Sequence, residues 1–92
     1  MPTRFESDER KRRANIEKHG FDFIWARQLF DGRPRFDFPS PRGEELRILS
    51  IGEVDEVMVA AVWTLRSEET VRLISVRRAR NEEEEQYHQL QR

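Results

Sequence analysis

Cationic residues that can bind phosphate or transfer protons stand near both ends of the sequence. Lys11 and the pair Lys18-His19 lie toward the N-terminus, and Arg77-Arg78 lies toward the C-terminus. Cleavage of RNA without a metal needs a group that accepts the 2′-hydroxyl proton, a group that protonates the leaving 5′-oxygen, and cations that stabilise the transition state. Histidine suits the proton transfers and arginine binds phosphate oxygens bidentately. These residue types therefore indicate a site that handles phosphate.

Four residues are candidates for the reacting groups of such a site: His19, Arg66, Arg77 and Arg78. His19 is the candidate acid or base. The alternative is a structural histidine at the C-terminus of a helix, where the helix dipole favours a cation. The arginines are candidates for stabilising the phosphate. Arg66 would lie near Arg77-Arg78 if the strands before and after the short turn at residues 67–69 form hydrogen bonds with each other. The alternative for the pair is that one arginine binds a carboxylate and the other is solvated.

Five further residues are candidates for binding RNA. Lys11, Lys18 and Arg47 would hold the phosphate backbone, and Trp63 and Tyr87 would stack on bases. For Trp63, packing in the hydrophobic core is the alternative. A cluster of cations at one end of a sheet would equally suit an acidic partner protein.

The composition excludes several kinds of site and of location. The chain has no Cys, two His, and neither a Gly-rich phosphate loop nor a nucleophile elbow, so we expect no metal and no cofactor. No apolar run approaches the roughly 20 residues of a membrane span, and the N-terminus lacks the apolar stretch of a signal peptide. We therefore expect a cytoplasmic protein with no membrane partner.

The charge is distributed unevenly along the chain. The whole chain has a net charge of −1, which argues against simple binding to nucleic acid through overall charge. Residues 82–85 are four consecutive glutamates, so the segment 81–92 is acidic and the remainder is mildly basic. Affinity for phosphate would therefore have to come from local placement of cations.

Local signals predict two helices in the N-terminal third. Ser7 or Asp8 is a suitable N-cap and Gly20 a suitable C-terminal residue for the first helix. Lys11, Asn15 and Lys18 share one face of that helix with Asp8. The second helix begins after Asp22, has apolar residues at helical spacing, and ends at residues 31–32.

The rest of the chain reads as β-structure followed by one helix. Strands are predicted at residues 35–38, 47–51, 57–65 and 70–77. Regular alternation in the last strand would place Ser75 and Arg77 on the face of Leu73, and Val76 and Arg78 on the opposite face. Asn81 is the predicted cap of the final helix, anchored by Tyr87 and Leu90.

These elements predict one α+β domain over residues 1–92. Short links between strands imply a four-stranded, mainly antiparallel sheet with helices packed on one face. The segment 81–92 is expected to form a peripheral acidic helix.

The joint pattern of these residues resembles the BrnT family of toxins from bacterial type II toxin–antitoxin systems. The residues that carry the resemblance are, in order, Phe5, Asp8, Lys11, Asn15, Lys18, His19, Gly20, Phe23, Ala26, Phe30, Asp31, Gly43, Glu44, Arg47, Thr64, Arg66, Ile74, Ser75, Arg77, Arg78, Ala79, Glu84 or Glu85, and Tyr87. Three positions depart from the family pattern. Ser7 replaces a Trp, Trp63 replaces a Tyr, and Val76 replaces an Ala.

The resemblance implies a RelE-like fold and an endoribonuclease that blocks translation. It also implies a cognate antitoxin with a ribbon-helix-helix domain, which inhibits the toxin and binds operator DNA in a heterotetrameric complex. The alternative is a non-catalytic interaction module that keeps the fold and binds an antitoxin-like partner. The departures at Ser7 and Trp63 bear on this alternative, because a lost aromatic side chain and a lost phenolic hydroxyl would weaken cleavage.

Overall fold

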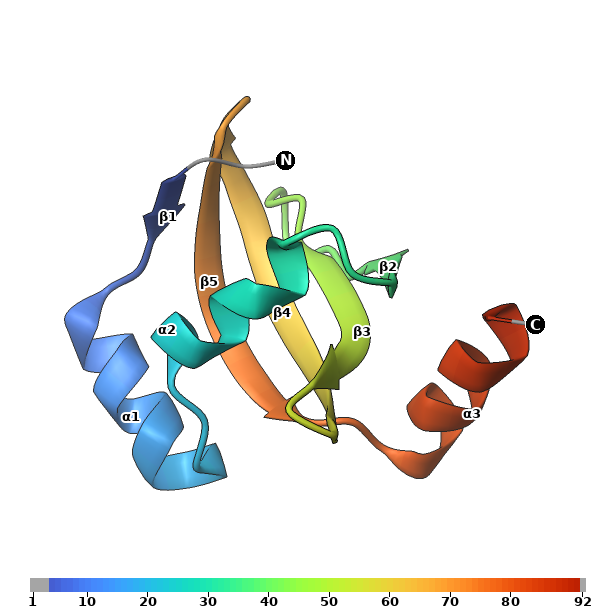
Figure 1. The fold of residues 1–92 in the computed structure, drawn as a ribbon. Coiled ribbons are helices and arrows are strands. Elements are labelled where there is room, and N and C mark those ends of the chain that lie inside the picture. Colours follow the sequence, from blue (N-terminus) through green and yellow to red (C-terminus); the bar gives the residue numbers. More distant parts are fainter. Residues whose placement is uncertain (1–3, 92) are drawn as a thin grey trace.

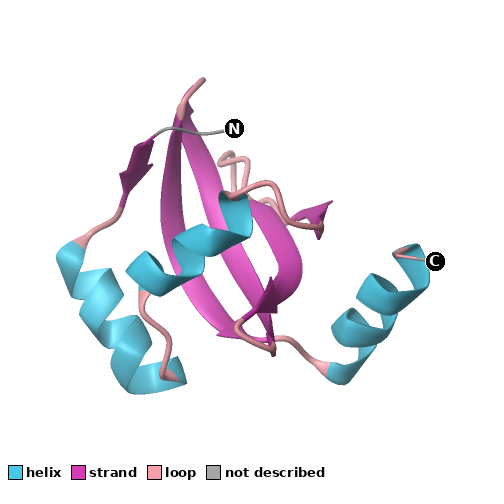
Figure 2. Ribbon diagram, viewed as in Figure 1, coloured by secondary structure: helices cyan, strands magenta, loops and turns pink. Residues whose placement is uncertain are grey.

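The structure is a computed structural model that describes residues 4–91, and its centre is a five-stranded sheet in the order β1-β5-β4-β3-β2 (Figure 1). The strands are β1 (Arg4–Glu6), β2 (Arg35–Pro39), β3 (Ile48–Val54), β4 (Val57–Ser67) and β5 (Thr70–Arg78). The helices are α1 (Glu9–His19), α2 (Phe23–Ala26), the 3-10 helix η1 (Arg27–Phe30) and α3 (Asn81–Leu90). The α+β class is confirmed (Figure 2), and the four predicted strands correspond to β2 to β5.

The sheet has one strand more than predicted and is mixed. Strands β2 to β5 are antiparallel neighbours, but β1 pairs in parallel with the start of β5, with Phe5 opposite Val71. The backbone N–H of Arg4 extends this pairing by donating to the Glu69 carbonyl at 3.0 Å. The sequence did not predict β1 because three residues with one apolar side chain show no alternation.

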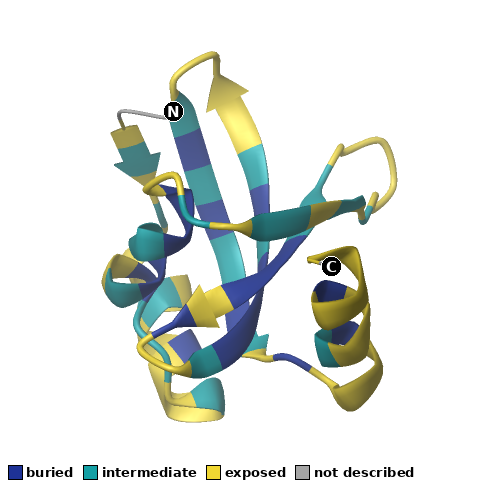
Figure 3. Ribbon diagram, turned by 45° about the vertical axis from the view of Figure 1, so that its right-hand side comes forward, coloured by how far each residue is buried: buried dark blue, intermediate teal, exposed yellow. Residues whose placement is uncertain are grey.

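Helices cover both faces of the sheet, whereas the sequence predicted helices on one face. The face that we call the α2 face carries the larger core, in which α2 and η1 pack on strand residues that include Val59 and Leu73. The opposite face, called the α3 face, carries a smaller cluster in which Tyr87 packs with Ile51 and Ala60. Figure 3 shows that the buried side of α3 is the side turned toward the sheet. The buried residues of α3 are Glu83 and Tyr87, so the helix is attached to the sheet mainly through these two side chains.

A β-bulge in β5 changes which residues share a face. Val62 pairs with Ser75 and the next residue, Trp63, pairs with Leu73, so Ile74 is an extra residue with no partner on β4. A bulge of this kind shifts the alternation by one residue beyond it. As a result Val76 lies on the α2 face with Leu73 and is buried, and Ser75 lies on the α3 face. The predicted regular alternation was wrong for this reason.

The helix ends follow their local signals, with three corrections. Asp8 is the N-cap of α1, where its carboxylate accepts from the Arg10 N–H at 2.8 Å, and Gly20 ends the helix with φ of 80°. The second predicted helix is divided into α2 and η1. The N-cap of α3 is Arg80 rather than Asn81, and Leu90 is 53% exposed and does not anchor that helix.

Candidate functional site

A rigid hairpin between β2 and β3 presents two of the cations. The loop is closed by Arg42 and Glu45, whose backbone groups exchange two hydrogen bonds of 3.1 Å. Gly43, with φ of 61°, occupies the first central position of the two-residue turn, where a positive φ favours glycine. The hydroxyl of Thr64 donates to the Leu46 carbonyl at 2.8 Å and ties the loop to β4. We call residues 40–47 the arginine hairpin, because it carries Arg42 and Arg47.

Helix α1 is fixed beside β5 by one buried amide. Asn15 is 6% exposed, and its Oδ1 accepts from the Val76 N–H at 3.0 Å. Its Nδ2 donates to the Val76 carbonyl at 2.9 Å and to the Phe21 carbonyl at 2.8 Å. This side chain therefore bonds to both backbone groups of Val76 at the edge of β5, beyond the stretch paired with β1. The sequence placed Asn15 on the helix face of Lys11 and Lys18 but gave it no role.

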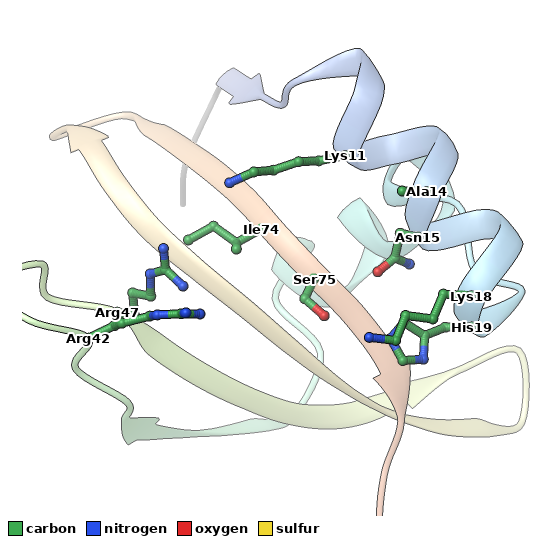
Figure 4. Close-up of a pocket in the computed structure, with 9 residues that line it drawn as sticks. All are labelled: Lys11, Ala14, Asn15, Lys18, His19, Arg42, Arg47, Ile74 and Ser75. Atoms are coloured by element: carbon green, nitrogen blue, oxygen red, sulfur yellow. The ribbon is translucent and has the colours of Figure 1, made fainter.

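Helix α1, β5 and the arginine hairpin enclose a hollow lined by cations, which we call the basic hollow. It consists of three adjoining cavities of about 320, 330 and 100 Å³, all lined in part by Arg47 and Ile74. The cationic and histidine side chains that line it are Lys11, Lys18, His19, Arg42, Arg47, Arg66 and Arg72. Figure 4 shows the lysines of α1 reaching over β5 while the two arginines of the hairpin approach from the opposite side.

The bulge supplies the floor of the basic hollow. Both Ile74 and Ser75 line it, although they are consecutive in a strand and would point to opposite faces without the bulge. Bulges commonly re-aim side chains in this way next to functional sites.

Some of these cations have carboxylate partners and others have none. Arg66 lies 3.4 Å and Arg72 4.0 Å from the Glu6 carboxylate, and Arg47 binds Glu45. The pKa of Glu45 is lowered chiefly by the hydrogen bond from Arg47, with further contributions from nearby Lys11 and Arg72.

The remaining cations of the hollow lack a direct carboxylate partner of this kind. Within residues 4–91, Lys11, Lys18 and Arg42 form no ion pair with a carboxylate. The hollow therefore carries an excess of positive charge in a chain whose net charge is −1. Such an excess favours the binding of a polyanion.

The register of the sheet separates the arginines that the sequence had grouped. Pairing across the β4–β5 turn places Arg66 near Arg72, whereas Arg77 lies opposite Ala60 at the other end of β5. The expectation of three guanidinium groups at one end of the sheet was therefore wrong. Arg66 lines the basic hollow, and neither Arg77 nor Arg78 does.

Arg77 is held in a two-point ion pair with the first turn of α3. Its two terminal nitrogens donate to the Glu83 carboxylate at 2.7 and 2.9 Å, and the same carboxylate accepts from the Arg80 N–H at 2.8 Å. The hydrogen bond from Arg77 is the main cause that lowers the pKa of Glu83. One arginine of the pair Arg77-Arg78 therefore binds a carboxylate, which is the alternative that the sequence left open for this pair. Arg78 is exposed and forms no ion pair within the part of the chain that the structure describes.

The two predicted stacking residues lie in the protein interior. Trp63 is 5% exposed on the α2 face, where its indole N–H donates to the buried Ser50 hydroxyl at 2.7 Å. Its ring meets Phe30 edge-on. Tyr87 is 9% exposed and packs edge-on against Phe36 on the α3 face. Neither ring lines the basic hollow, and Trp63 packs in the core, which was the alternative stated for it.

The structure also identifies site residues that the sequence did not single out, namely Arg42, Arg72 and Glu45. Their spacing along the chain carries no signal, since the hairpin and the β5 register bring them together. Over residues 4–91 no three His, Asp or Glu side chains gather in a way that would hold a metal ion. In the same residues, none of the helices has the length and apolar character needed to cross a membrane.

Comparisons with known proteins identify the family and support the fold. The sequence profile described as "Ribonuclease toxin, BrnT, of type II toxin-antitoxin system" matches residues 8–83. Among solved structures, the chain is similar to the crystal structure of the Brucella abortus ribonuclease toxin BrnT, with a TM-score of 0.70 and 31% sequence identity. That match covers 86% of this chain and all of the Brucella chain. No curated protein matches the sequence.

Proposed function

Because the chain belongs to the BrnT family of ribonuclease toxins of type II toxin–antitoxin systems, we propose that it cleaves RNA and thereby inhibits translation. The proposed reaction needs no metal. The 2′-oxygen attacks the neighbouring phosphorus, the bond to the 5′-oxygen breaks, and the products end in a 2′,3′-cyclic phosphate and a 5′-hydroxyl. One proton leaves the 2′-hydroxyl and one reaches the 5′-oxygen, so side chains alone suffice.

The observation that carries this proposal is the basic hollow. Lys11 and Lys18 from α1 and Arg42 from the hairpin line it without carboxylate partners in the described residues, although the chain as a whole is slightly acidic. Phosphate groups of RNA supply the missing negative charge, and releasing their counterions favours binding. We assign the two lysines, together with Arg47, to the RNA backbone.

We assign one of the two proton transfers to His19 and the stabilisation of the phosphate to Arg66 and Arg72. His19 lines the hollow from the C-terminal end of α1, and an imidazole has nitrogens that can accept or donate a proton. Arg66 and Arg72 share Glu6, at distances that leave guanidinium donors available to phosphate oxygens. Arg77 we assign to holding α3, and Arg78, the other half of the predicted pair, to no step of the reaction.

The protein partner is proposed from the family. A type II system implies a protein antitoxin. We propose that it carries a ribbon-helix-helix domain, forms a heterotetramer with the toxin and binds operator DNA itself. The toxin then acts as one domain over residues 1–92, in the cytoplasm, where translation takes place.

The competing proposal is a binding module without catalysis. One support for this competing proposal was that Trp63 replaces the family's Tyr and so lacks a phenolic hydroxyl. Because Trp63 is buried, a tyrosine hydroxyl at that position would lie in the core rather than in the hollow, and the support is weakened.

RNA cleavage by the purified, antitoxin-free protein in excess chelator tests the proposal. We expect fragments with 2′,3′-cyclic phosphate ends, and a loss of at least about 100-fold in kcat/KM for His19→Ala, the usual contribution of a general acid or base. Arg13→Ala is the matched control, because Arg13 is exposed on the same helix, outside the hollow, and its removal changes the net charge. Intact RNA with folded native protein, or equal losses in both variants, would refute the proposed reaction.

A further inference from the structure

The cavity beside the arginine hairpin differs in chemistry from the rest of the basic hollow. It has a volume of about 330 Å³ and is lined by Ser40, Pro41, Arg42, Arg47, Val62, Ile74 and Ser75. Val62, Ile74 and Pro41 give it an apolar surface, which a phosphate group does not need. We propose that this cavity binds one RNA base next to the cleaved phosphate and that it sets the sequence preference of cleavage; this inference rests on the proposed function. We call it the base pocket.

The planar guanidinium of Arg42 is the group that we expect to stack on the base. Proteins that recognise single-stranded RNA splay the bases out and stack them on aromatic rings or on arginine planes. No aromatic side chain lines the base pocket, and Arg42 forms no ion pair within residues 4–91, so its plane is free to stack. The isopropyl group of Val62 on β4 lines the same pocket and gives it an apolar surface.

The base pocket is built before any ligand arrives. The hairpin is closed by the two backbone hydrogen bonds between Arg42 and Glu45, and the Ser40 N–H donates to the Arg47 carbonyl at 2.8 Å. The bond from Thr64 to Leu46 fixes the same loop to β4. A preformed pocket avoids part of the ordering cost of binding. These bonds fix the backbone at Arg42, from which the guanidinium extends.

The pocket also offers polar groups that can read the edge of a base. Ser75 and Ser40 line it, and neither side chain makes a hydrogen bond in the described part of the chain. Ser75 lines the pocket because the bulge at Ile74 turns it to this face. A hydroxyl donates and accepts, so a base edge with either kind of group finds a partner.

Abasic substitution tests the base pocket while leaving the RNA backbone intact. A short RNA that the native protein cuts at one site is prepared with an abasic ribose at each position in turn. We expect one position next to the cut to lower kcat/KM about tenfold, within the range measured for base stacking. The penalty should shrink to less than about twofold in Val62→Phe, which fills the pocket, and in Arg42→Lys, which keeps the charge but not the plane. Leu65→Phe is the control, because Leu65 lies on β4 like Val62 but is exposed and outside the pocket. In this variant the tenfold penalty should remain.

The outcomes separate this inference from the proposed function. If the native protein cuts RNA but no abasic position is selective, or the penalty is equal in Val62→Phe, Arg42→Lys and native protein, the base pocket is refuted while the ribonuclease stands. If no RNA is cut, equilibrium binding of a uniform single-stranded RNA is compared with its fully abasic counterpart. Tighter binding of the RNA with bases, lost in Val62→Phe but not in Leu65→Phe, would then support the pocket. Equal binding, or no binding, would refute it.

Discussion

Replacing Arg77 by alanine should destabilise the protein without abolishing RNA cleavage. The guanidinium and the Glu83 carboxylate are joined by two short hydrogen bonds, and their side chains are 22% and 12% exposed. A fully exposed pair would contribute at most about 1 kcal/mol, and breaking a buried pair costs about 3–5 kcal/mol. Because this pair is mostly but not fully buried, and Glu83 keeps its bond from the Arg80 N–H, we expect a loss of about 2 kcal/mol.

Urea unfolding measures this loss, and pH provides a second, independent readout. The pKa of Glu83 is lowered in the folded protein, chiefly by the hydrogen bond from Arg77. Its contribution to stability is therefore present above the unfolded pKa of about 4.3 and is lost as the pH falls through the folded pKa. The native protein should thus lose more free energy of unfolding between pH 5 and pH 3 than Arg77→Ala does. Glu83→Gln should behave like Arg77→Ala, and Glu85→Gln, an exposed glutamate of the same helix, should change the free energy by less than about 0.5 kcal/mol.

Cleavage measured well below the unfolding transition decides between the two roles of Arg77. Glu83→Gln removes the ion pair but keeps the arginine, so a structural role predicts that both variants cleave RNA at nearly the native rate. The reasoning fails if Arg77→Ala is inactive while its unfolding free energy is unchanged and Glu83→Gln is active. Arg77 would then act on RNA, as the sequence alone suggested, after α3 releases it.

Two further predictions concern the supports of the site and of the sheet. Asn15→Ala should lower the free energy of unfolding by about 3 kcal/mol in urea titrations, because it leaves the Val76 N–H and two carbonyls without partners; a change as small as that of Arg13→Ala would refute the role of Asn15. Glu56→Gly should raise the melting temperature and increase the free energy of unfolding by about 1 kcal/mol, because Glu56 has φ of 67° in the β3–β4 turn and glycine adopts that conformation without strain. An unchanged or lower melting temperature would show that the turn is not strained.

Elements with strong local signals were predictable from the sequence. Asp8 and Gly20 define the limits of α1 because capping chemistry depends on neighbouring residues only. The apolar run of β4 predicts a central strand covered on both faces, and both faces of that strand are covered. The short turn at residues 68–69 explains why β4 and β5 pair, but not their full register, which shifts between Leu65 and Ser67 and again between Val62 and Trp63. Local chemistry therefore accounts for strands β2 to β5 and for the limits of α1.

The parts that were not predictable depend on contacts between distant segments. β1 has three residues and becomes a strand only because β5 offers a free edge at Val71. Arg42 and Arg72 enter the basic hollow from a hairpin and a strand 30 residues apart in sequence, so no motif announces them. Of the predicted site residues that line it, Lys11, Lys18 and His19 share one helix, where spacing alone is informative, whereas Arg47 and Arg66 come from two other segments.

The bulge at Ile74 explains both why the predicted regular alternation of β5 was wrong and how the basic hollow is formed. The segment Leu73 to Val76 contains apolar residues in both alternating sets, so its pattern does not fix which face each residue takes. The structure resolves this choice by burying Val76 and bonding its backbone to Asn15, which requires one extra residue between Leu73 and Ser75. That extra residue gives the hollow its floor and turns Arg77 toward Glu83. An irregularity that a sequence pattern cannot show therefore places the floor of the hollow and Arg77 on the same face of the sheet, where position along β5 separates Arg77 from Arg66 and Arg72.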